Sequence, residues 1–266
     1  MMESGAGRTE EDLFEANRRF YDAMWAGARL VTAERFNTWP LVRSLLTPSP
    51  RLEVGPGLRP RLPIAGTHFL DASVPALEVL RGLQGRVALG RITALPYPDG
   101  SFDPVCALDI IEHVDDEHGA FAELTRVTAP GGALLLSVPL HPSRWTAFDD
   151  FVGHRRRYEP GRLLETLGRH GLTVERSAGY GMQPKSSRLL DFGMWWLQHR
   201  RDRAMWWYNH VIMRIGLRFQ KKLAIVPGMI DMEEVDEILL VCRKNGSRAR
   251  GAGEREGAAG ITGRRP

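Results

Sequence analysis

The 266-residue sequence predicts a doubly wound α/β domain with a mostly parallel sheet, and two observations support this prediction. Short apolar runs alternate with segments of helical spacing, and short turns join them, which is the pattern of strand–helix–strand units. Residues 133–140 are apolar almost throughout, as expected for a parallel strand that is covered on both faces. The length suffices for one such domain with an insertion.

Composition narrows the class of protein. No run of eighteen apolar residues is present, so no membrane span is predicted, and the first residues lack the apolar core of a signal peptide. Cys106 and Cys242 each lie inside an apolar run, so we expect two buried, unpaired thiols and a cytoplasmic protein. Residues 246–266 supply +3 of the net charge of +4, which makes the charge poor evidence for nucleic-acid binding.

A glycine turn follows directly after the first predicted strand. Residues 51–54 form an apolar strand that ends at Gly55 and Gly57, where the missing Cβ lets the backbone approach a ligand. The next strand ends at Asp71, whose two oxygens suit the hydroxyls of a ribose. Pro60 stands where a dinucleotide fingerprint needs glycine, and no P-loop lysine follows. These features predict a site for a different nucleoside-containing cofactor.

The N-terminal part is predicted to be helical. We expect residues 1–10 to be disordered and residues 11–48 to form a helical lid, with a new helix beginning at Pro40. Tyr21 and Trp25 would close over the cofactor and contact the substrate, or else simply pack against the sheet. The main domain is predicted over residues 49–245, followed by a disordered tail at 246–266.

The remaining elements follow from apolar periodicity and from turn residues. Two prolines within residues 58–66 leave room for only a short or broken helix. Further helices are expected at 74–81, 115–126 and 159–171, and strands at 86–90, 105–111, 133–140, 172–180 and 235–242.

One segment is more specific than the general pattern. Residues 94–114, then Glu123–Val127 and Pro130–Gly132, resemble the core of class I methyltransferases that depend on S-adenosylmethionine, and more narrowly their ubiquinone-biosynthesis-like branch. The resemblance covers about residues 51–181. It implies a seven-stranded, mostly parallel sheet with an antiparallel last strand, and S-adenosylmethionine as the cofactor.

The resemblance also implies roles for particular residues. Glu53, Gly55 and Gly57 would lie under the methionine portion of the cofactor, and Asp71 would bind its ribose. Ile92 and Thr93 would contact the adenine. Leu108 and Asp109 would accept hydrogen bonds from the amino group, and His113 would lie near the sulfonium. Arg59 replaces the family's third glycine, and Arg91 replaces an acid that accepts from adenine, which arginine cannot do.

The acceptor side is predicted in the loop after the fifth strand. Its Asp150, Gly153, His154, Arg156 and Tyr158 resemble a segment of the same branch. Trp145, Arg156 and Tyr158 would contact the substrate, and His141 or His154 would be a general base, because histidine titrates near neutrality. In the alternative interpretation these side chains brace the loop. No metal site is predicted.

Residues 182–230 are predicted to form a helical insert before the last strand. It holds four of the seven tryptophans, in two pairs eleven residues apart, and residues 185–222 carry nine Lys/Arg against two Asp. Such a segment would roof the acceptor pocket, contact a membrane surface, or form a dimer interface. The five acids within residues 231–237 would neutralise part of its charge.

These observations predict methyl transfer to a small-molecule or lipid-like acceptor. Two alternatives remain open. Arg59 and Arg91 motivate a binding or scaffold domain that has lost catalysis. A nucleic-acid methyltransferase is less favoured, because the fourth strand lacks the Asn/Asp-Pro-Pro-Tyr/Phe motif of base-flipping enzymes, and no nucleic-acid partner is expected.

Overall fold

The computed structural model describes residues 15, 18, 19, 21–25, 27–181, 193, 195, 196 and 199–246, without the side chains of 201, 202 and 205. The predictions of disorder at 1–10 and beyond residue 246, and much of the predicted helix at 182–198, lie outside this range.

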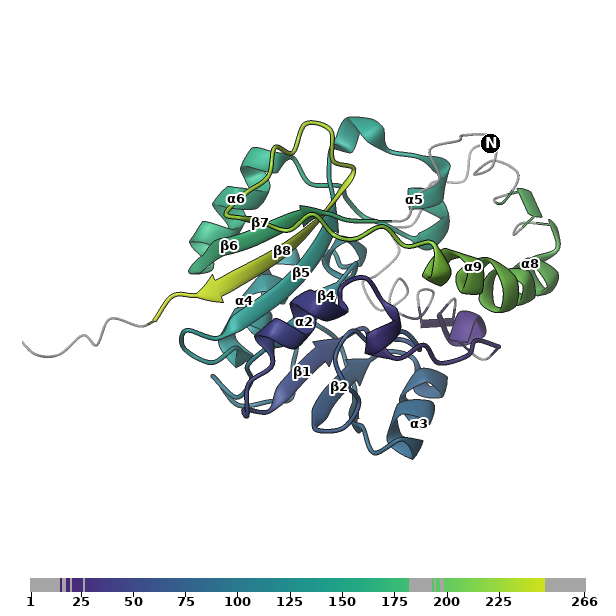
Figure 1. Ribbon diagram of the computed structural model, residues 1–266, viewed down its shortest axis with the longest axis horizontal. Coiled ribbons are helices and arrows are strands. Elements are labelled where there is room, and N and C mark those ends of the chain that lie inside the picture. The colour runs from purple at the N-terminus through teal and green to yellow at the C-terminus, as the bar shows by residue number, and fades with distance from the viewer. Residues whose placement is uncertain are drawn as a thin grey trace, which may run out of the picture.

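An eight-stranded sheet forms the centre of the described chain, in the order β3-β2-β1-β4-β5-β8-β6-β7 (Figure 1). The strands that pair in parallel are β1 to β5, and β8 runs antiparallel between β5 and β6. The strand bounds are β1 Arg51–Val54, β2 Thr67–Asp71, β3 Arg86–Leu89, β4 Val105–Leu108, β5 Ala133–Pro139, β6 Leu172–Gly179, β7 Val226–Pro227 and β8 Glu237–Lys244.

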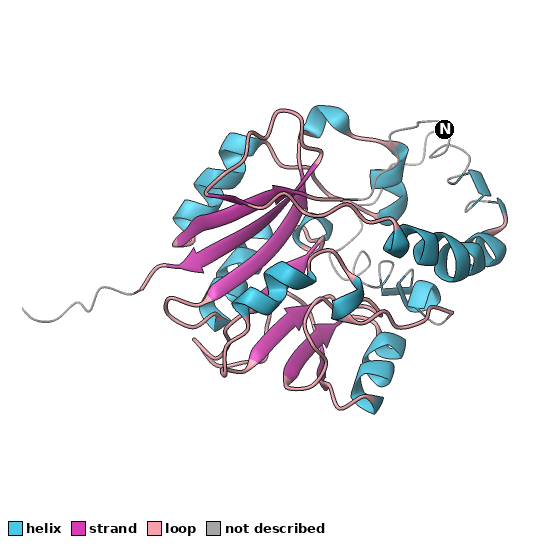
Figure 2. Cartoon of the chain, in the orientation of Figure 1, coloured by secondary structure: helices cyan, strands magenta, loops and turns pink. Residues whose placement is uncertain are grey.

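Helices cover both faces of the sheet (Figure 2). On one face α4 and α6 pack on Leu52, Leu134 and other residues of the main apolar core. On the other face α2 packs on Cys106 and Leu135, and α3 packs on Phe69. The helix bounds are η1 Ala33–Arg35, α2 Trp39–Leu45, α3 Val74–Gly82, η2 Ile111–His113, α4 Glu117–Val127, η3 Pro142–Arg144, α5 Ala147–Val152, α6 Pro160–Arg169, α8 Arg201–Trp207, the π-helical η4 Tyr208–Ile212 and α9 Met213–Arg218.

The predicted fold class is confirmed, with four local corrections. The predicted helical lid at residues 11–48 is interrupted, because residues 27–32 contain no helix and only a 3-10 turn lies between them and α2. The two-residue strand β7 extends the sheet beyond the seven predicted strands. The strand predicted to run to residue 111 ends at Leu108, because Asp109 has a positive φ of 53° and a 3-10 turn follows. The helical part of the insert ends at Arg218, well before residue 230.

Three sequence predictions about smaller features also hold: those about Pro40, about residues 58–66 and about the two cysteines. Helix α2 begins at Trp39 with Pro40 in its first turn, where a missing N–H costs nothing. Residues 58–66 contain no helix. Cys106 and Cys242 are buried and unpaired. No helix among the described residues is long and apolar enough to cross a bilayer.

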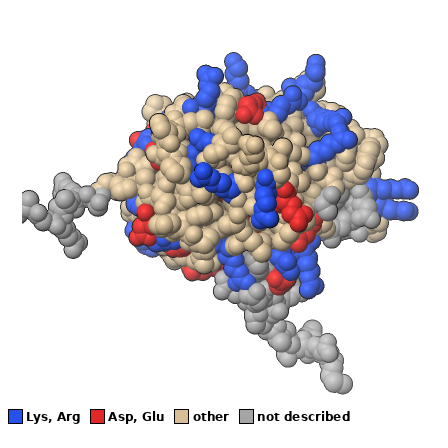
Figure 3. All heavy atoms as spheres, turned by 90° about the horizontal axis from the view of Figure 1, so that it is seen from below, with Lys and Arg blue, Asp and Glu red and all other residues tan. Residues whose placement is uncertain are grey.

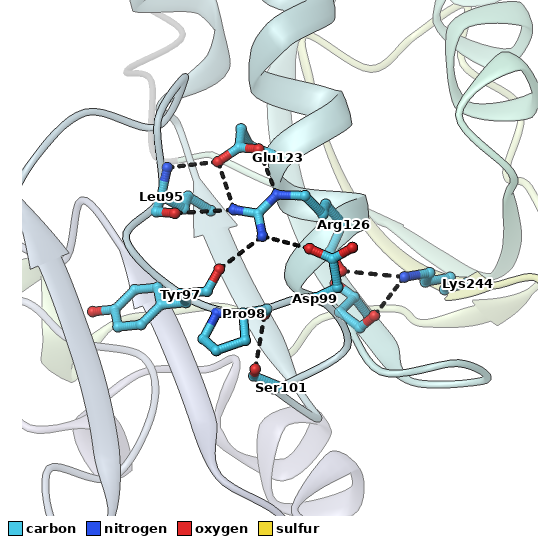
Figure 4. A network of polar contacts seen from close by, with 9 residues as sticks. Leu95, Tyr97, Pro98, Asp99, Ser101, Glu123, Arg126 and Lys244 are labelled. Carbon is cyan, nitrogen blue, oxygen red and sulfur yellow. Dashed lines mark hydrogen bonds and ion pairs between the residues drawn. The ribbon is translucent and has the colours of Figure 1, made fainter.

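A polar network fixes the turn-rich segment before β4 (Figure 4). Arg126 of α4 donates to the carbonyls of Leu95 (2.9 Å) and Tyr97 (2.7 Å) and pairs with Glu123 and Asp99. Glu123 in turn accepts from the amide of Leu95. Because these bonds tie the segment to α4, residues 91–95 are held next to the carboxyl ends of the strands.

Charged side chains are distributed unevenly over the surface. On the face drawn in Figure 3, lysine and arginine stand in several separate groups, with smaller acidic groups among them. On that face the basic side chains do not merge into one continuous band.

Candidate active site

A cavity of about 1260 Å³ lies at the carboxyl ends of the parallel strands, the edge at which ligands bind in open α/β sheets. In Figure 1, α8 and α9 stand beyond this edge. The lining comes from the ends of β1, β2 and β4, from the start of β8, from Tyr21 and Trp25 near the N-terminus, and from residues 208–224. The cavity therefore joins the predicted cofactor turn to the predicted lid and insert.

The glycine turn forms a cradle that side chains would fill. Gly55 has a φ of +69°, and a Cβ placed on it would lie 2.1 Å from Cδ1 of Ile110. Gly57 has a φ of +50°, and its Cβ would lie 2.2 Å from the Trp25 ring. Trp25 thus packs directly on Gly57, which explains why Gly57 is not among the cavity-lining residues although it shapes the turn.

Two buried carboxylates hold this turn. Glu53 accepts from the amides of Arg61 (2.8 Å) and Leu62 (2.9 Å), and burial raises its pKa to about 7. Asp71 accepts from the amides of Gly57 (2.9 Å) and Ser73 (2.8 Å), and burial likewise raises its pKa. Each Asp71 oxygen keeps a second lone pair, so the carboxylate can still accept from two hydroxyls.

Arg59 does not fill the turn. Its guanidinium donates to the Tyr208 hydroxyl and to the Asn209 side chain, both at 3.1 Å. It also lies over the rings of Trp25 and Tyr208, 5.2 and 5.0 Å from their centroids. Arg59 therefore connects the turn to η4 rather than crowding it. Arg91 is half-buried and lines the cavity next to Ile92 and Thr93.

Acidic side chains line the middle of the cavity. Asp109 accepts from the Ser137 hydroxyl, and Glu112 and Glu237 line the same space. Burial and the neighbouring Asp109 carboxylate raise the pKa of Glu112 and of Glu237 well above the usual value. A cationic ligand would relieve this repulsion, as the sulfonium and ammonium groups of S-adenosylmethionine would.

Two of the three predicted histidines lie at this cavity. His113 and His154 meet with their ring centroids 4.7 Å apart, and the Tyr21 hydroxyl lies 3.3 Å from Nε2 of His113. Burial and the neighbouring His154 lower the pKa of His113 to about 3. Burial also lowers the pKa of His154, against the effect of the Asp149 carboxylate. Both rings are therefore neutral at pH 7.

A buried ion pair orients His154. Asp149 accepts from Nδ1 of His154 at 2.8 Å, so Nε2 is the nitrogen left for the cavity. Arg157 donates to both Asp149 oxygens at 2.8 Å, and both side chains are buried. Burial raises the pKa of Asp149, but the bonds from Arg157 and Thr146 outweigh it and lower that pKa to about 2.

The other predicted acceptor residues lie away from the cavity lining. His141, with a φ of 59°, turns its Nε2 to the carbonyl of Met232, 2.8 Å away. Trp145 donates to Asp150 on the surface, and Arg156 bonds the carbonyls of Val114 and Asp115 and pairs with Glu117. Tyr158 packs in the main core. For these four residues the contacts support the alternative interpretation of the sequence, in which they brace the loop.

The remaining predicted cofactor residues do line the cavity. These are Ile92, Thr93, Leu108 and Asp109, next to Gly55 and Asp71. Glu112 and Glu237 were not predicted as site residues. Glu237 was missed because the last strand was predicted to begin at residue 235, whereas β8 begins at Glu237, opposite the end of β5.

Comparison with known proteins agrees with this geometry. Residues 57–136 match a family model described as "Methyltransferase domain". The chain is 36% identical over 116 residues to a probable S-adenosylmethionine-dependent methyltransferase of Mycolicibacterium smegmatis, covering 41% of this chain and 44% of that protein. It is also 36% identical over 85 residues to the demethylmenaquinone methyltransferase of Thermus thermophilus, covering 30% and 39%. The chain thus spans less than half the length of these relatives.

Solved structures share the fold at low sequence identity. A methyltransferase structure from Thermotoga maritima matches with a TM-score of 0.55 and 16% identity, covering 89% of this chain and 97% of that one. The 4+2 cyclase SpnF matches with a TM-score of 0.52 and 19% identity, covering 86% and 95%. The family match, the strand order and the glycine turn confirm the resemblance drawn from the sequence. Residues 57–136 therefore form a methyltransferase domain, and the matched relatives support S-adenosylmethionine as its cofactor.

Proposed function

We propose that this protein transfers a methyl group from S-adenosylmethionine to a small-molecule or lipid-like acceptor. The observation that carries the proposal is the cradle of Gly55 beside the buried carboxylate of Asp71 and the half-buried carboxylate of Asp109, at one end of a large cavity. Names of matched proteins give independent support for a small acceptor, since they include a demethylmenaquinone methyltransferase and an ajmaline N-methyltransferase of Rauvolfia serpentina.

In this proposal each part of the donor meets a matching surface. Asp71 accepts from the two ribose hydroxyls, the backbone at Ile92 and Thr93 borders the adenine, and Asp109 with Glu237 faces the amino group. When bound, the donor supplies a methyl group activated by its sulfonium. The residues of the chain then supply alignment, which accounts for much of the rate in such a displacement.

The acceptor occupies the other part of the cavity. Apolar side chains line it on two sides, from α5 and from the insert: Phe148, Val152, Ile212, Ile215 and Phe219. Its polar end is formed by His113 and His154. His154 is the proposed proton acceptor for an acceptor that arrives protonated, because Asp149 fixes the ring and leaves Nε2 free.

Donor binding tests the cofactor half of the proposal. We expect calorimetry to show S-adenosylmethionine binding, and Asp71→Ala to weaken it by roughly 10- to 100-fold, because hydrogen bonds to a charged group are lost. Glu78→Ala on the exposed face of α3 is the matched control and should bind normally. Absence of binding by the folded wild type would instead favour a scaffold domain. Transfer itself is measured with radiolabelled donor and extracted metabolites.

The face of the insert supports the membrane interpretation of the sequence. Trp206, Trp207, Ile212 and Ile215 are about half exposed and Phe219 is 75% exposed, although all are large apolar residues. Exposed basic residues flank them: Arg203, Arg214, Arg218, Lys221 and Lys222. Ile212, Ile215 and Phe219 also line the cavity. We therefore propose that this face contacts anionic lipid and admits a lipid-like acceptor.

Vesicle binding tests the membrane proposal. We expect the protein to bind vesicles of phosphatidylcholine with about 30% phosphatidylserine, and the double variant Trp206→Ser/Phe219→Ser to bind at least about tenfold more weakly. Trp145→Ser, which removes an exposed tryptophan elsewhere, should bind as the wild type does. If the wild type does not bind these vesicles, lipid contact is contradicted. If it also sediments as a dimer that the double variant dissociates, the predicted dimer interface is favoured instead.

A further inference from the structure

Three potential metal ligands converge at the polar end of the cavity. Glu112 and His113 lie in η2, directly after β4, and His154 lies in the loop after α5. One ligand atom of each lies within 4.8 Å of the other two, and Oε1 of Glu112 is 3.9 Å from Nε2 of His154. All three residues line the cavity.

The surrounding contacts orient these groups as they are oriented in metal sites. Histidine ligands commonly donate their second ring N–H to a carboxylate, which fixes the ring and raises its basicity. Asp149 does this for His154 at 2.8 Å and is itself held by Arg157. The amide of Arg155 donates to the carbonyl of Glu112 at 2.7 Å, which joins η2 to the loop that carries His154.

The protein itself leaves this cluster incompletely satisfied. Oε2 of Glu112 and Nδ1 of His113 are buried and have no hydrogen-bond partner among the residues that the structure describes. The side chain of Glu112 is only 1% exposed, and the carboxylates of Asp109 and Asp149 lie near it. Buried polar atoms without partners are costly, and a cation would pair with them and offset the local negative charge.

We propose that Glu112, His113 and His154 bind a divalent transition-metal cation. Two imidazoles and one carboxylate suit zinc or iron(II), which leave coordination positions open at such sites. Bonds of about 2.1 Å place tetrahedral ligands about 3.4 Å apart, whereas the ligand atoms here lie within 4.8 Å of one another, so binding would draw them together by up to about 1.4 Å.

The open positions of the cation face the cavity. They would hold an oxygen of the acceptor and lower its pKa, so that the acceptor loses its proton to water. In the metal-bound protein this replaces the role as proton acceptor proposed above for His154, because its Nε2 is then a ligand. This role toward the acceptor rests on the proposed methyl transfer, whereas binding of the cation does not.

Metal titration of the full chain tests the site. Protein stripped with a chelator is titrated with Zn²⁺ in competition with a chromogenic chelator, and with Co²⁺ followed by visible absorption. We expect one tight Zn²⁺ per chain and Co²⁺ bands of a site with nitrogen and oxygen ligands. Asp149→Asn should weaken Zn²⁺ binding by about 10- to 100-fold, and His113→Ala and His154→Ala should weaken it further.

A second histidine pair provides the matched control. His118 and His170 stack 5.7 Å apart on the surface, but the nearby Glu117 is occupied by Arg156 and Arg162. His170→Ala should leave Zn²⁺ binding unchanged. The proposal is wrong if the wild type binds no tight Zn²⁺, or if His113→Ala and His154→Ala bind it as the wild type does. Thermal unfolding of each variant verifies its fold, and calorimetry with S-adenosylmethionine tests the proposed function separately.

Discussion

Replacing Arg157 with methionine is expected to lower the free energy of unfolding by about 3–5 kcal/mol. The guanidinium is 1% exposed, and its removal leaves the Asp149 carboxylate buried with one fewer charged partner. Asp149 also accepts hydrogen bonds from Thr146 and His154, so we expect its displacement to destabilise the start of α5 and the loop that follows this helix. Denaturant unfolding followed by circular dichroism measures the change.

An exposed pair of the same type is the control for Arg157. Arg169 and Glu165 lie 3.4 Å apart on α6, and both side chains are about two-thirds exposed. Arg169→Met should cost less than about 1 kcal/mol. Coupling is tested with Arg157→Met/Asp149→Leu, which should lose less stability than the two single variants added together. An Arg157→Met protein as stable as the wild type would contradict the burial of this pair.

Replacing Gly55 with valine is expected to weaken S-adenosylmethionine binding by about 100-fold or more, on the order of 3 kcal/mol. A β-branched residue at a φ of +69° is strained, and its Cβ would lie 2.1 Å from Ile110. The added methyl groups would also occupy the cradle that the donor needs. Calorimetry with the donor measures the affinity, and thermal unfolding shows whether the variant is folded.

A glycine in helix α3 provides the control for Gly55→Val, because replacing it tests whether glycine substitution in general weakens donor binding. A Cβ added to Gly82, in the last turn of α3, would meet no atom of another segment within 4 Å, and this glycine has no positive φ. Gly82→Ala should bind the donor normally and unfold at an equal or higher temperature. If folded Gly55→Val binds the donor as tightly as the wild type, the donor does not lie in this turn.

Much of the fold was accessible from the sequence because its signals are local. Apolar runs mark the parallel strands, and β1, β2, β3 and β5 lie within two residues of their predicted bounds. The end of β4 was misplaced because Ile110 and Ile111 continue the apolar run, although the backbone turns at Asp109. Apolar character reports burial, whereas a positive φ at a non-glycine residue leaves no clear signal.

The site was only partly accessible, because it depends on contacts between distant segments. Gly55, Asp71 and Asp109 follow strand ends and could be located by the rule for open sheets. His141 and His154 were both candidate bases from the sequence, and only the structure separates them: His141 bonds a carbonyl of residue 232, and His154 faces the cavity. The pairing of Arg59 with Tyr208 joins residues 149 positions apart and has no local signal.

Strand β8 is synthesised after both of its neighbours, β5 and β6, although it lies between them in the sheet. Both neighbours are made long before β8, and until residues 237–244 emerge their facing edges carry unpaired amides and carbonyls. Glu237, at the start of this late strand, also completes the acidic wall of the cavity. A nascent chain that lacks residues 237–244 would therefore be both prone to aggregate and unable to assemble its ligand pocket.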